Sequence, residues 1–225
     1  MSPHPLEKPR TAEAVQIPVG TRMLSGDLAV PAGARGLVIF AHGSGSNRTS
    51  PRNRQIADAL DRGGLATLLV DLLTLEEEDT DRRTGRLRFD MTLLAARLVG
   101  FCAWAQKLPD LRGLPVGLFG ASSGVGAALL AAAEQPRSFR AVVGRGGRPD
   151  LAGSSIRRVM APTLLIVGEH DDQVLDINRR AADRMLTDVR LEVVSGATHF
   201  FTEPGTLDQV AQLASDWFRE RLTVG

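Results

Sequence analysis

The chain's 225 residues and 24.1 kDa suit one α/β domain, or at most two small ones. Lys and Arg total 27 against 26 Asp and Glu, and this net charge of +1 leaves no overall basic field for nucleic acid or an anionic membrane. The single cysteine, Cys102, excludes an internal disulfide and a Cys-rich zinc site. No apolar run approaches the ~20 residues of a membrane span, and the first residues lack a signal peptide's apolar stretch. We therefore expect a soluble, cytoplasmic protein with a small-molecule ligand and neither metal nor cofactor.

Residues 1–11 are polar and rich in proline, and we expect a flexible tail there, followed by a single domain over residues 12–225. Several later apolar runs (LVIF, TLLV, VGLF, LLIV) lack polar alternation, as is typical of parallel strands covered on both faces. The first two candidates mix polar and apolar residues, and we expect an antiparallel edge pair that turns near Gly20. The predicted strands are Glu13–Ile17, Leu24–Val30, Gly36–Ala41, Ala66–Asp71, Pro115–Phe119, Arg140–Gly144, Thr163–Val167 and Arg190–Val194.

Helical patterns separate these strands. The apolar residues recur at helical spacing in five segments: 53–62, 89–106, 125–134, 174–185 and 207–222. The charged stretch Glu76–Arg88 has no such spacing, and we expect a solvated loop there. Alternating strands and helices predict an α/β fold with a mainly parallel eight-stranded sheet flanked by helices.

The strongest local motif is Gly120-Ala121-Ser122-Ser123-Gly124, which fits the pattern G-x-S-x-G. An apolar run leads into it and a helical run follows it, so the motif has the strand–turn–helix setting that it requires. The two glycines permit a tight, strained turn that exposes the serine hydroxyl at the carboxyl end of the sheet. The alternative is a glycine-rich turn without chemistry. We predict that Ser122 is a nucleophile.

A serine hydroxyl needs a base. Of the four histidines, only His170 and His199 follow Ser122, and proteins with this elbow run serine, acid, histidine along the chain. The acid is expected at the end of a strand that lies between the serine and the histidine in the chain, and only His199 follows such a strand end at sufficient distance. We therefore predict His199 as the base, although a lone loop histidine is more often surface decoration.

The acid is expected at the end of the strand before that histidine. Four candidates follow this strand: Glu169, Asp171, Asp172 and Asp176. Asp171 stands where the chain has just left the strand, and we favour it over Asp172, which would then cap the following helix. The acid would hold the imidazole in the correct tautomer and stabilise its protonated form.

Two backbone N–H groups are needed to stabilise an oxyanion. The N–H of Ser123 directly follows the nucleophile, and the loop His42-Gly43-Ser44-Gly45-Ser46 follows the third predicted strand. We choose the N–H groups of Ser123 and Ser44. The loop lacks the residues of a P-loop or a dinucleotide fingerprint, which argues against the alternative of a phosphate-binding loop.

These motifs together resemble the α/β-hydrolase superfamily, and within it the small, capless branch around dienelactone hydrolase. The matching segments are HGSGS (42–46), GLFGASSGVGAAL (117–129), PTLLIVGEHDDQV (162–174) and SGATHFF (195–201). The resemblance implies the α/β-hydrolase fold, with Ser122, Asp171 and His199 as the triad. One departure is that dienelactone hydrolase carries cysteine where this chain has Ser122. Cys102 does not replace it, because it lies within a predicted helix and is expected to be a core residue.

The short connection from Gly144 to Met160 leaves no room for a large lid, which favours an open site. Arg145 ends a predicted strand at the edge where ligands bind in such sheets, and could hold a substrate carboxylate or instead pair with Asp150. We expect a solvated helix start at Arg48, Arg52 and Arg54. Asp71 is either a neighbour of the site or a turn cap.

The predicted function is hydrolysis of small carboxylic esters or thioesters through an acyl-enzyme. The sequence leaves lactonase and peptidase activity open. Two alternatives remain beside hydrolysis: a ligand-binding module without turnover, and acyl transfer to an acceptor other than water.

Overall fold

The computed structural model describes residues 12–222, so the predicted tail at residues 1–11 lies outside the described residues. Eight strands form one sheet in the order β1-β2-β4-β3-β5-β6-β7-β8. All eight predicted strands are confirmed, with ends shifted by at most two residues. Their bounds are β1 Glu13–Val19, β2 Arg22–Ala29, β3 Leu37–Ala41, β4 Ala66–Val70, β5 Val116–Ala121, β6 Ala141–Arg145, β7 Thr163–Gly168 and β8 Val189–Val194.

The sheet is mainly parallel, as predicted. Strands β1 and β2 form the expected antiparallel hairpin, whose turn contains Gly20 at a φ of 60°. Strand β2 also pairs antiparallel with β4, whereas β4, β3, β5, β6, β7 and β8 run parallel to their neighbours. The carboxyl ends of the central parallel strands therefore meet at one edge of the sheet, where residues from distant parts of the sequence come together.

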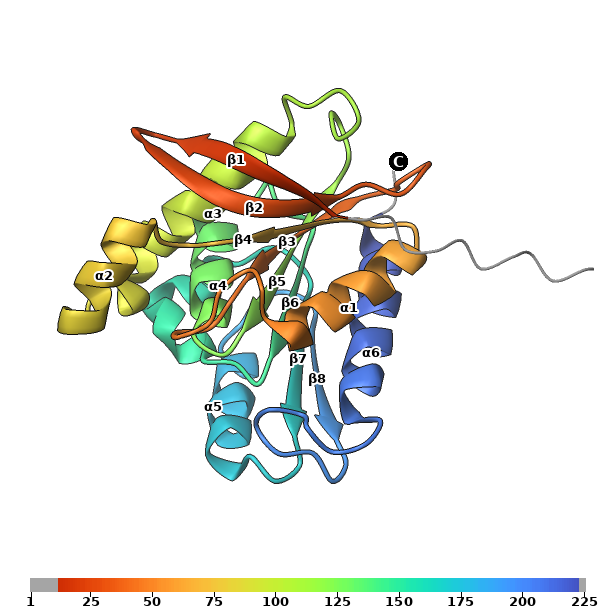
Figure 1. Cartoon of the computed structure of the whole chain (residues 1–225). Helices are drawn as coiled ribbons and strands as arrows, with labels where there is room; N and C mark the ends of the chain where they lie inside the picture. Colours follow the sequence, from red (N-terminus) through yellow and green to blue (C-terminus); the bar gives the residue numbers. More distant parts are fainter. Residues whose placement is uncertain (1–11, 223–225) are drawn as a thin grey trace, which may run out of the picture.

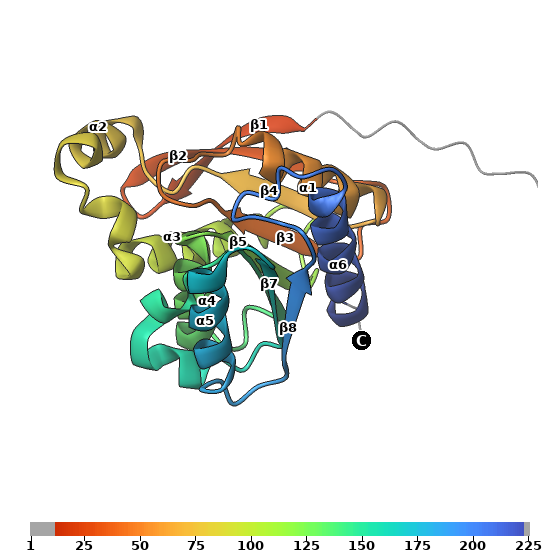
Figure 2. The same ribbon diagram turned by 90° about the horizontal axis from the view of Figure 1, so that it is seen from below.

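Helices cover both faces of the sheet (Figures 1 and 2). One face packs against α1 (Pro51–Arg62) and α6 (Thr206–Arg221), and the other against α3 (Met91–Ala105), α4 (Gly124–Glu134) and α5 (Asp172–Ala182). The two faces have separate hydrophobic cores, and side chains alternate between them along each strand. In β3, for example, Leu37 and Ile39 pack on the α3–α4 side, while Val38 and Phe40 pack on the α1–α6 side. This double burial explains why the central strands are apolar throughout.

The prediction of a loop over Glu76–Arg88 is wrong. Residues Leu75–Thr84 form helix α2, and a 3₁₀ turn, η1, follows at Leu87–Phe89. The helix begins with a capping box: the N–H of Glu77 donates to Thr74 Oγ1 at 3.3 Å, and the N–H of Thr74 donates to Glu77 Oε2 at 2.8 Å. The two bonds satisfy backbone donors that would otherwise lack partners at the start of the helix.

The connection between β6 and β7 contains no large lid. It forms a 3₁₀ segment, η2 (Pro149–Arg158), which is kinked at Gly153 and packs mainly against α4. Cys102 is buried in α3, where burial raises the pKa of its thiol to about 11, so the prediction of a core cysteine is confirmed. None of the described helices is both long and apolar enough to cross a membrane.

Candidate active site

Ser122 occupies the sharp turn between β5 and α4. Its φ of 52° lies in the left-handed region, which is strained for a serine. The turn is tight: a Cβ on Gly120 would lie 2.6 Å from Val125 Cα, and one on Gly124 would collide with the carbonyl oxygen of Ala41. Both flanking positions therefore require glycine, as the motif predicts. The N–H of Ser122 donates to the carbonyl of Arg145 at 3.1 Å, which ties the turn to the end of β6.

His199 and Asp171 lie side by side at the same edge of the sheet. His199 Nδ1 and Asp171 Oδ2 are 2.6 Å apart, and the carboxylate is largely buried while the imidazole is one-third exposed. The imidazole lies against Gly146, where a Cβ would be 3.6 Å from its Nδ1 and Cε1 atoms. His199 and Ser122 both line one cavity of about 490 Å³. The structure thus gathers Ser122, His199 and Asp171 around one site.

The other candidate acids serve different contacts. Glu169 Oε2 accepts from Ser195 Oγ at 2.8 Å and from the N–H of Gly196 at 2.7 Å, which fixes the turn after β8. Asp172 is the exposed first residue of α5 and not its cap, contrary to expectation. Asp171 holds the cap position, but its carboxylate makes no capping bond and is left for His199. No group of three or more His, Cys, Asp or Glu side chains within residues 12–222 is placed to hold a metal ion.

The loop after β3 approaches the serine closely. A Cβ on Gly43 would lie 2.8 Å from Ser122 Cβ, so this part of the loop must be glycine. The N–H of Ser44 donates to Ser123 Oγ at 2.8 Å. This donor is therefore engaged in the structure, and the predicted use of the Ser44 N–H for an oxyanion requires that the Ser123 side chain turn away. The oxyanion role of the Ser44 and Ser123 N–H groups remains a prediction.

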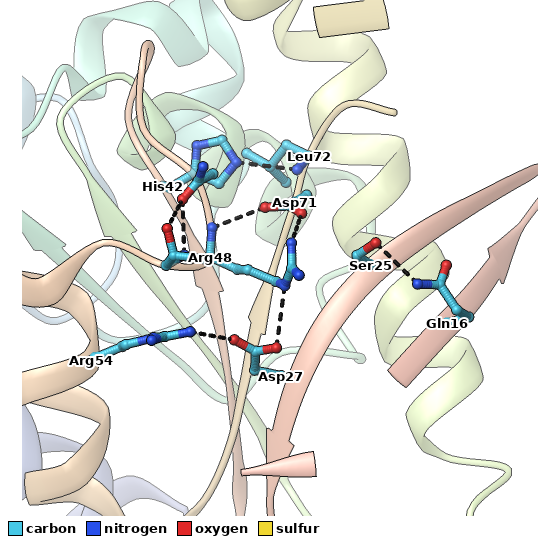
Figure 3. Close-up of polar contacts among 10 residues, drawn as sticks. Gln16, Ser25, Asp27, His42, Arg48, Arg54, Asp71 and Leu72 are labelled. Carbon is cyan, nitrogen blue, oxygen red and sulfur yellow. Dashed lines mark hydrogen bonds and ion pairs between the residues drawn. The ribbon is translucent and has the colours of Figure 1, made fainter. Parts of the chain in front are cut away.

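A polar network ties this loop to β2 and β4 (Figure 3). Arg48 pairs with Asp71 at the end of β4 and, at 3.2 Å, with Asp27 in β2; its own N–H also donates to Asp71 at 2.9 Å. His42 Nε2 accepts from the N–H of Leu72 at 3.2 Å, and His42 Nδ1 lies 3.0 Å from the Gly43 carbonyl oxygen. Since Nε2 accepts, Nδ1 carries the proton and the ring is neutral. Burial lowers the pKa of His42.

Two arginines border the cavity beside Ser122. Arg145, at the end of β6, is 8% exposed and lines the cavity. Asp150 pairs with Arg148 at 2.7 Å and not with Arg145, and the role of Arg145 in substrate binding stays a prediction. Arg52, near the start of α1, lines the same cavity and lies over the Phe200 ring at 4.9 Å.

The expected solvated helix start is therefore wrong for Arg48 and Arg52. Arg48 is bound to two carboxylates, and Arg52 is half-buried at the cavity; Arg54 is exposed but pairs with Asp27 at 2.9 Å. Of these three arginines, Arg52 alone lines the cavity, and its place shortly after the glycine-rich loop at the ligand-binding edge is the one sequence feature that indicates this.

The fold and the geometry of this site are those of an α/β-hydrolase, with a serine on a strand–turn–helix elbow and a histidine–aspartate pair at the same sheet edge. Comparison with known proteins places the chain in one family within this class. Residues 24–223 match the model of the dienelactone hydrolase family, and the chain belongs to that family. A crystal structure of dienelactone hydrolase from Anabaena variabilis shares 56% identity with it at a TM-score of 0.92, covering 95% of this chain and 99% of the other.

More distant structures share the fold alone. Est1E from Butyrivibrio proteoclasticus is 16% identical at a TM-score of 0.76, over 92% of this chain and 98% of its own. A serine hydrolase homologue from Coxiella burnetii is 19% identical at a TM-score of 0.74, over 92% and 97% of the two chains.

Curated relatives from two strains of Mycobacterium tuberculosis are longer proteins. Each bears the name "Putative phosphoribosyl transferase" and is 54% identical over 216 residues. The match covers 96% of this chain and 48% of the relative, so the chain spans about half the length of these proteins.

Proposed function

We propose that the chain is a serine hydrolase that cleaves small carboxylic esters or thioesters through an acyl-enzyme. The observation that carries the proposal is the 2.6 Å contact between His199 Nδ1 and Asp171 Oδ2, at a cavity that Ser122 also lines. The family match and the dienelactone hydrolase structure at 56% identity support a hydrolase. The transferase name of the longer relatives is not carried over, because about half of each lies outside the match.

In the proposed reaction, Ser122 Oγ attacks the substrate carbonyl while His199 Nε2 takes the hydroxyl proton. The tetrahedral oxyanion would accept hydrogen bonds from the N–H groups of Ser123 and Ser44. Collapse breaks the bond to the alcohol or thiol, which leaves with the proton from His199. Water then adds to the acyl-enzyme, gives its proton to His199, and the carboxylic acid departs as Ser122 recovers its hydrogen. Asp171 keeps the Nδ1 proton on the imidazole throughout and stabilises its cationic form.

A fluorophosphonate probe tests the nucleophile directly. Intact-protein mass spectrometry is expected to show one adduct on the wild-type chain and none on Ser122→Ala. Ser154→Ala is the matched control, because Ser154 is exposed in the β6–β7 connection, and it is expected to label fully. An unlabelled wild-type protein would instead favour a binding module without turnover. Labelling that survives Ser122→Ala would assign the nucleophile to another residue.

A further inference from the structure

The hydroxyl of Ser123 is bound to a backbone donor from a distant part of the sequence. The N–H of Ser44 donates to Ser123 Oγ at 2.8 Å, across a separation of 79 residues. Ser123 stands at the N-cap position of α4, where a serine usually accepts from N–H groups of the first helical turn. Here its side chain makes no capping bond. The hydroxyl therefore serves the loop after β3 and not the helix.

Ser123 thus affects both N–H groups that the proposed mechanism assigns to the oxyanion. Its own N–H follows the nucleophile and has no hydrogen-bond partner among residues 12–222. The N–H of Ser44, in contrast, is already satisfied by the Ser123 hydroxyl. A backbone N–H carries a single hydrogen, so an oxyanion must displace the hydroxyl before it receives both donors in good geometry.

The Ser44 N–H does not depend on this hydroxyl for its position. On one side of Ser44, the carbonyl of Gly43 accepts from the N–H of Ser46 at 3.1 Å, which closes a turn around the donor. On the other side, Arg48 binds Asp71 through both its backbone N–H, at 2.9 Å, and its guanidinium. These contacts hold the loop at both ends. The donor therefore remains in place when the hydroxyl leaves it.

The hydroxyl also has space into which it can turn. Ser123 lines the cavity of about 290 Å³ that adjoins the Gly43–Asn47 loop, whereas Ser122 lines the cavity of about 490 Å³. A serine side chain can occupy three staggered rotamers. Ser123 Oγ makes one hydrogen bond within the described residues, so a change of rotamer breaks a single bond.

Resting on the proposed hydrolase function, we propose that the Ser123 hydroxyl is a positioning group that occupies the Ser44 N–H in the resting protein and is displaced by the oxyanion in the transition state. In the resting protein the hydroxyl satisfies a backbone donor that would otherwise lack an acceptor. In the reaction the same bond must break before the oxyanion gains its second donor. The serine at this position therefore stabilises the loop and slows the formation of the tetrahedral intermediate.

The test removes the hydroxyl and measures rate and stability together. Ser123→Ala frees the Ser44 N–H, so kcat/KM for 4-nitrophenyl butyrate is expected to rise by about 3- to 10-fold, which corresponds to one ordinary hydrogen bond. The inhibition constant of butylboronic acid, whose adduct with Ser122 resembles the tetrahedral intermediate, should fall by a similar factor. The melting temperature should fall as well, because the resting loop loses an acceptor. A purely structural role instead predicts that both rate and stability fall.

Two further variants serve as controls. Ser123→Thr keeps a hydroxyl at this position and should restore the rate and the melting temperature toward those of the wild type. Ser215→Ala removes a hydroxyl of similar burial from α6, where the residue lines neither cavity, and should leave kcat/KM unchanged. A folded Ser123→Ala protein whose kcat/KM is equal to or lower than that of the wild type would overturn the proposal.

A crystal structure of the wild-type adduct with butylboronic acid tests the inference without a substitution. An oxygen of the adduct should accept from the Ser44 N–H, with Ser123 Oγ turned away from it. An Oγ that still accepts from the Ser44 N–H contradicts the proposal, while the adduct on Ser122 continues to support the hydrolase. If neither butylboronic acid nor the fluorophosphonate reacts with Ser122, the hydrolase proposal fails, and this inference fails with it.

Discussion

At the scale of single residues, the contact between His199 and Asp171 depends on one carboxylate oxygen. Asp171→Asn keeps the shape of the side chain but replaces the carboxylate with a neutral amide. The His199 imidazole then loses the acceptor that fixes its tautomer and the negative charge that stabilises its protonated form. On the proposed mechanism, kcat for 4-nitrophenyl butyrate is expected to fall by about 10⁴-fold in Asp171→Asn. Asp172→Asn, one residue along and exposed, should leave kcat unchanged. Equal losses in both variants, or none in either, would remove Asp171 from the triad.

His42 is expected to make the stability of the fold depend on pH. Burial lowers its pKa below the ordinary value of 6.5, so the unfolded chain binds a proton at this position more readily than the folded chain. The free energy of unfolding therefore falls as pH drops below about 6.5 and is unaffected by this group above it. Wild-type protein should lose more thermal stability between about pH 7.5 and 5.5 than His42→Asn does.

His170 gives the control for that measurement, because it is an exposed histidine at the same edge of the sheet. His170→Asn should show the same pH dependence of the melting temperature as the wild type. If the His42→Asn protein keeps the pH dependence of the wild type, protonation of His42 is not the cause of the loss of stability in acid.

The positions of some candidate site residues could be predicted from the sequence, and those of others could not. Ser122, His199 and Asp171 follow from a local turn motif and from chain order, because parallel strands bring their carboxyl ends to one edge. Arg52 could not be placed this way, because its position depends on how α1 packs, which the α1–α6 contacts decide. The Ser44–Ser123 hydrogen bond likewise joins two loops that are 79 residues apart, and no local pattern encodes it.

At the scale of elements, helix α2 is a helix that the spacing of apolar residues does not predict. Its residues carry mostly charges, so no apolar face marks the segment as helical. The charges have partners beyond the segment: Glu77 binds Arg97 of α3 through two contacts of 2.6 and 2.7 Å, and Asp81 binds Arg88. The sequence does contain the two end signals of this helix: the capping-box residues Thr74 and Glu77 at its start and Gly85 at its end, which adopts the left-handed conformation in the structure.

The Glu77–Arg97 pair is expected to anchor α2 to the rest of the fold. Arg97 is 5% exposed and also donates to the carbonyl of Leu72 at 2.5 Å, so removal of Glu77 leaves a buried guanidinium without its carboxylate. Glu77→Ala should lower the free energy of unfolding by about 3 kcal/mol in urea titrations at neutral pH. Glu76→Ala, on the exposed side of the same turn, should change it by less than about 0.5 kcal/mol.

The stabilisation by the Glu77–Arg97 pair is also expected to depend on pH. Arg97 holds the pKa of Glu77 below its usual value, so the stabilisation is present above the unfolded-state pKa and is lost as pH falls through the lower, folded-state pKa. The difference in stability between the wild type and Glu77→Ala should therefore shrink in acid. A constant difference across this range would assign the loss to the capping box and helix packing rather than to the charge.

At the scale of the whole molecule, the proposed function implies that the sheet, its helices and the short β6–β7 connection limit the length of the substrate. The cavity at Ser122 measures about 490 Å³, and the Gly43–Asn47 loop separates it from a second cavity of about 290 Å³. Both volumes suit small ligands rather than long chains. The wall beside Ser122 is formed largely by loop residues and the two arginines, and η2 packs on α4 instead of covering the opening.

An alkyl chain that extends beyond this cavity stays in water, whereas each buried methylene would contribute about 0.8 kcal/mol, or about fourfold in kcat/KM. Within a series of neutral 4-nitrophenyl esters from acetate to decanoate, kcat/KM is therefore expected to rise no further than butyrate. The rates are measured below the critical micelle concentration and corrected with Ser122→Ala protein, which removes hydrolysis that does not depend on the serine. A kcat/KM that keeps rising to decanoate would require a long apolar channel over Ser122. It would contradict an open site without a lid.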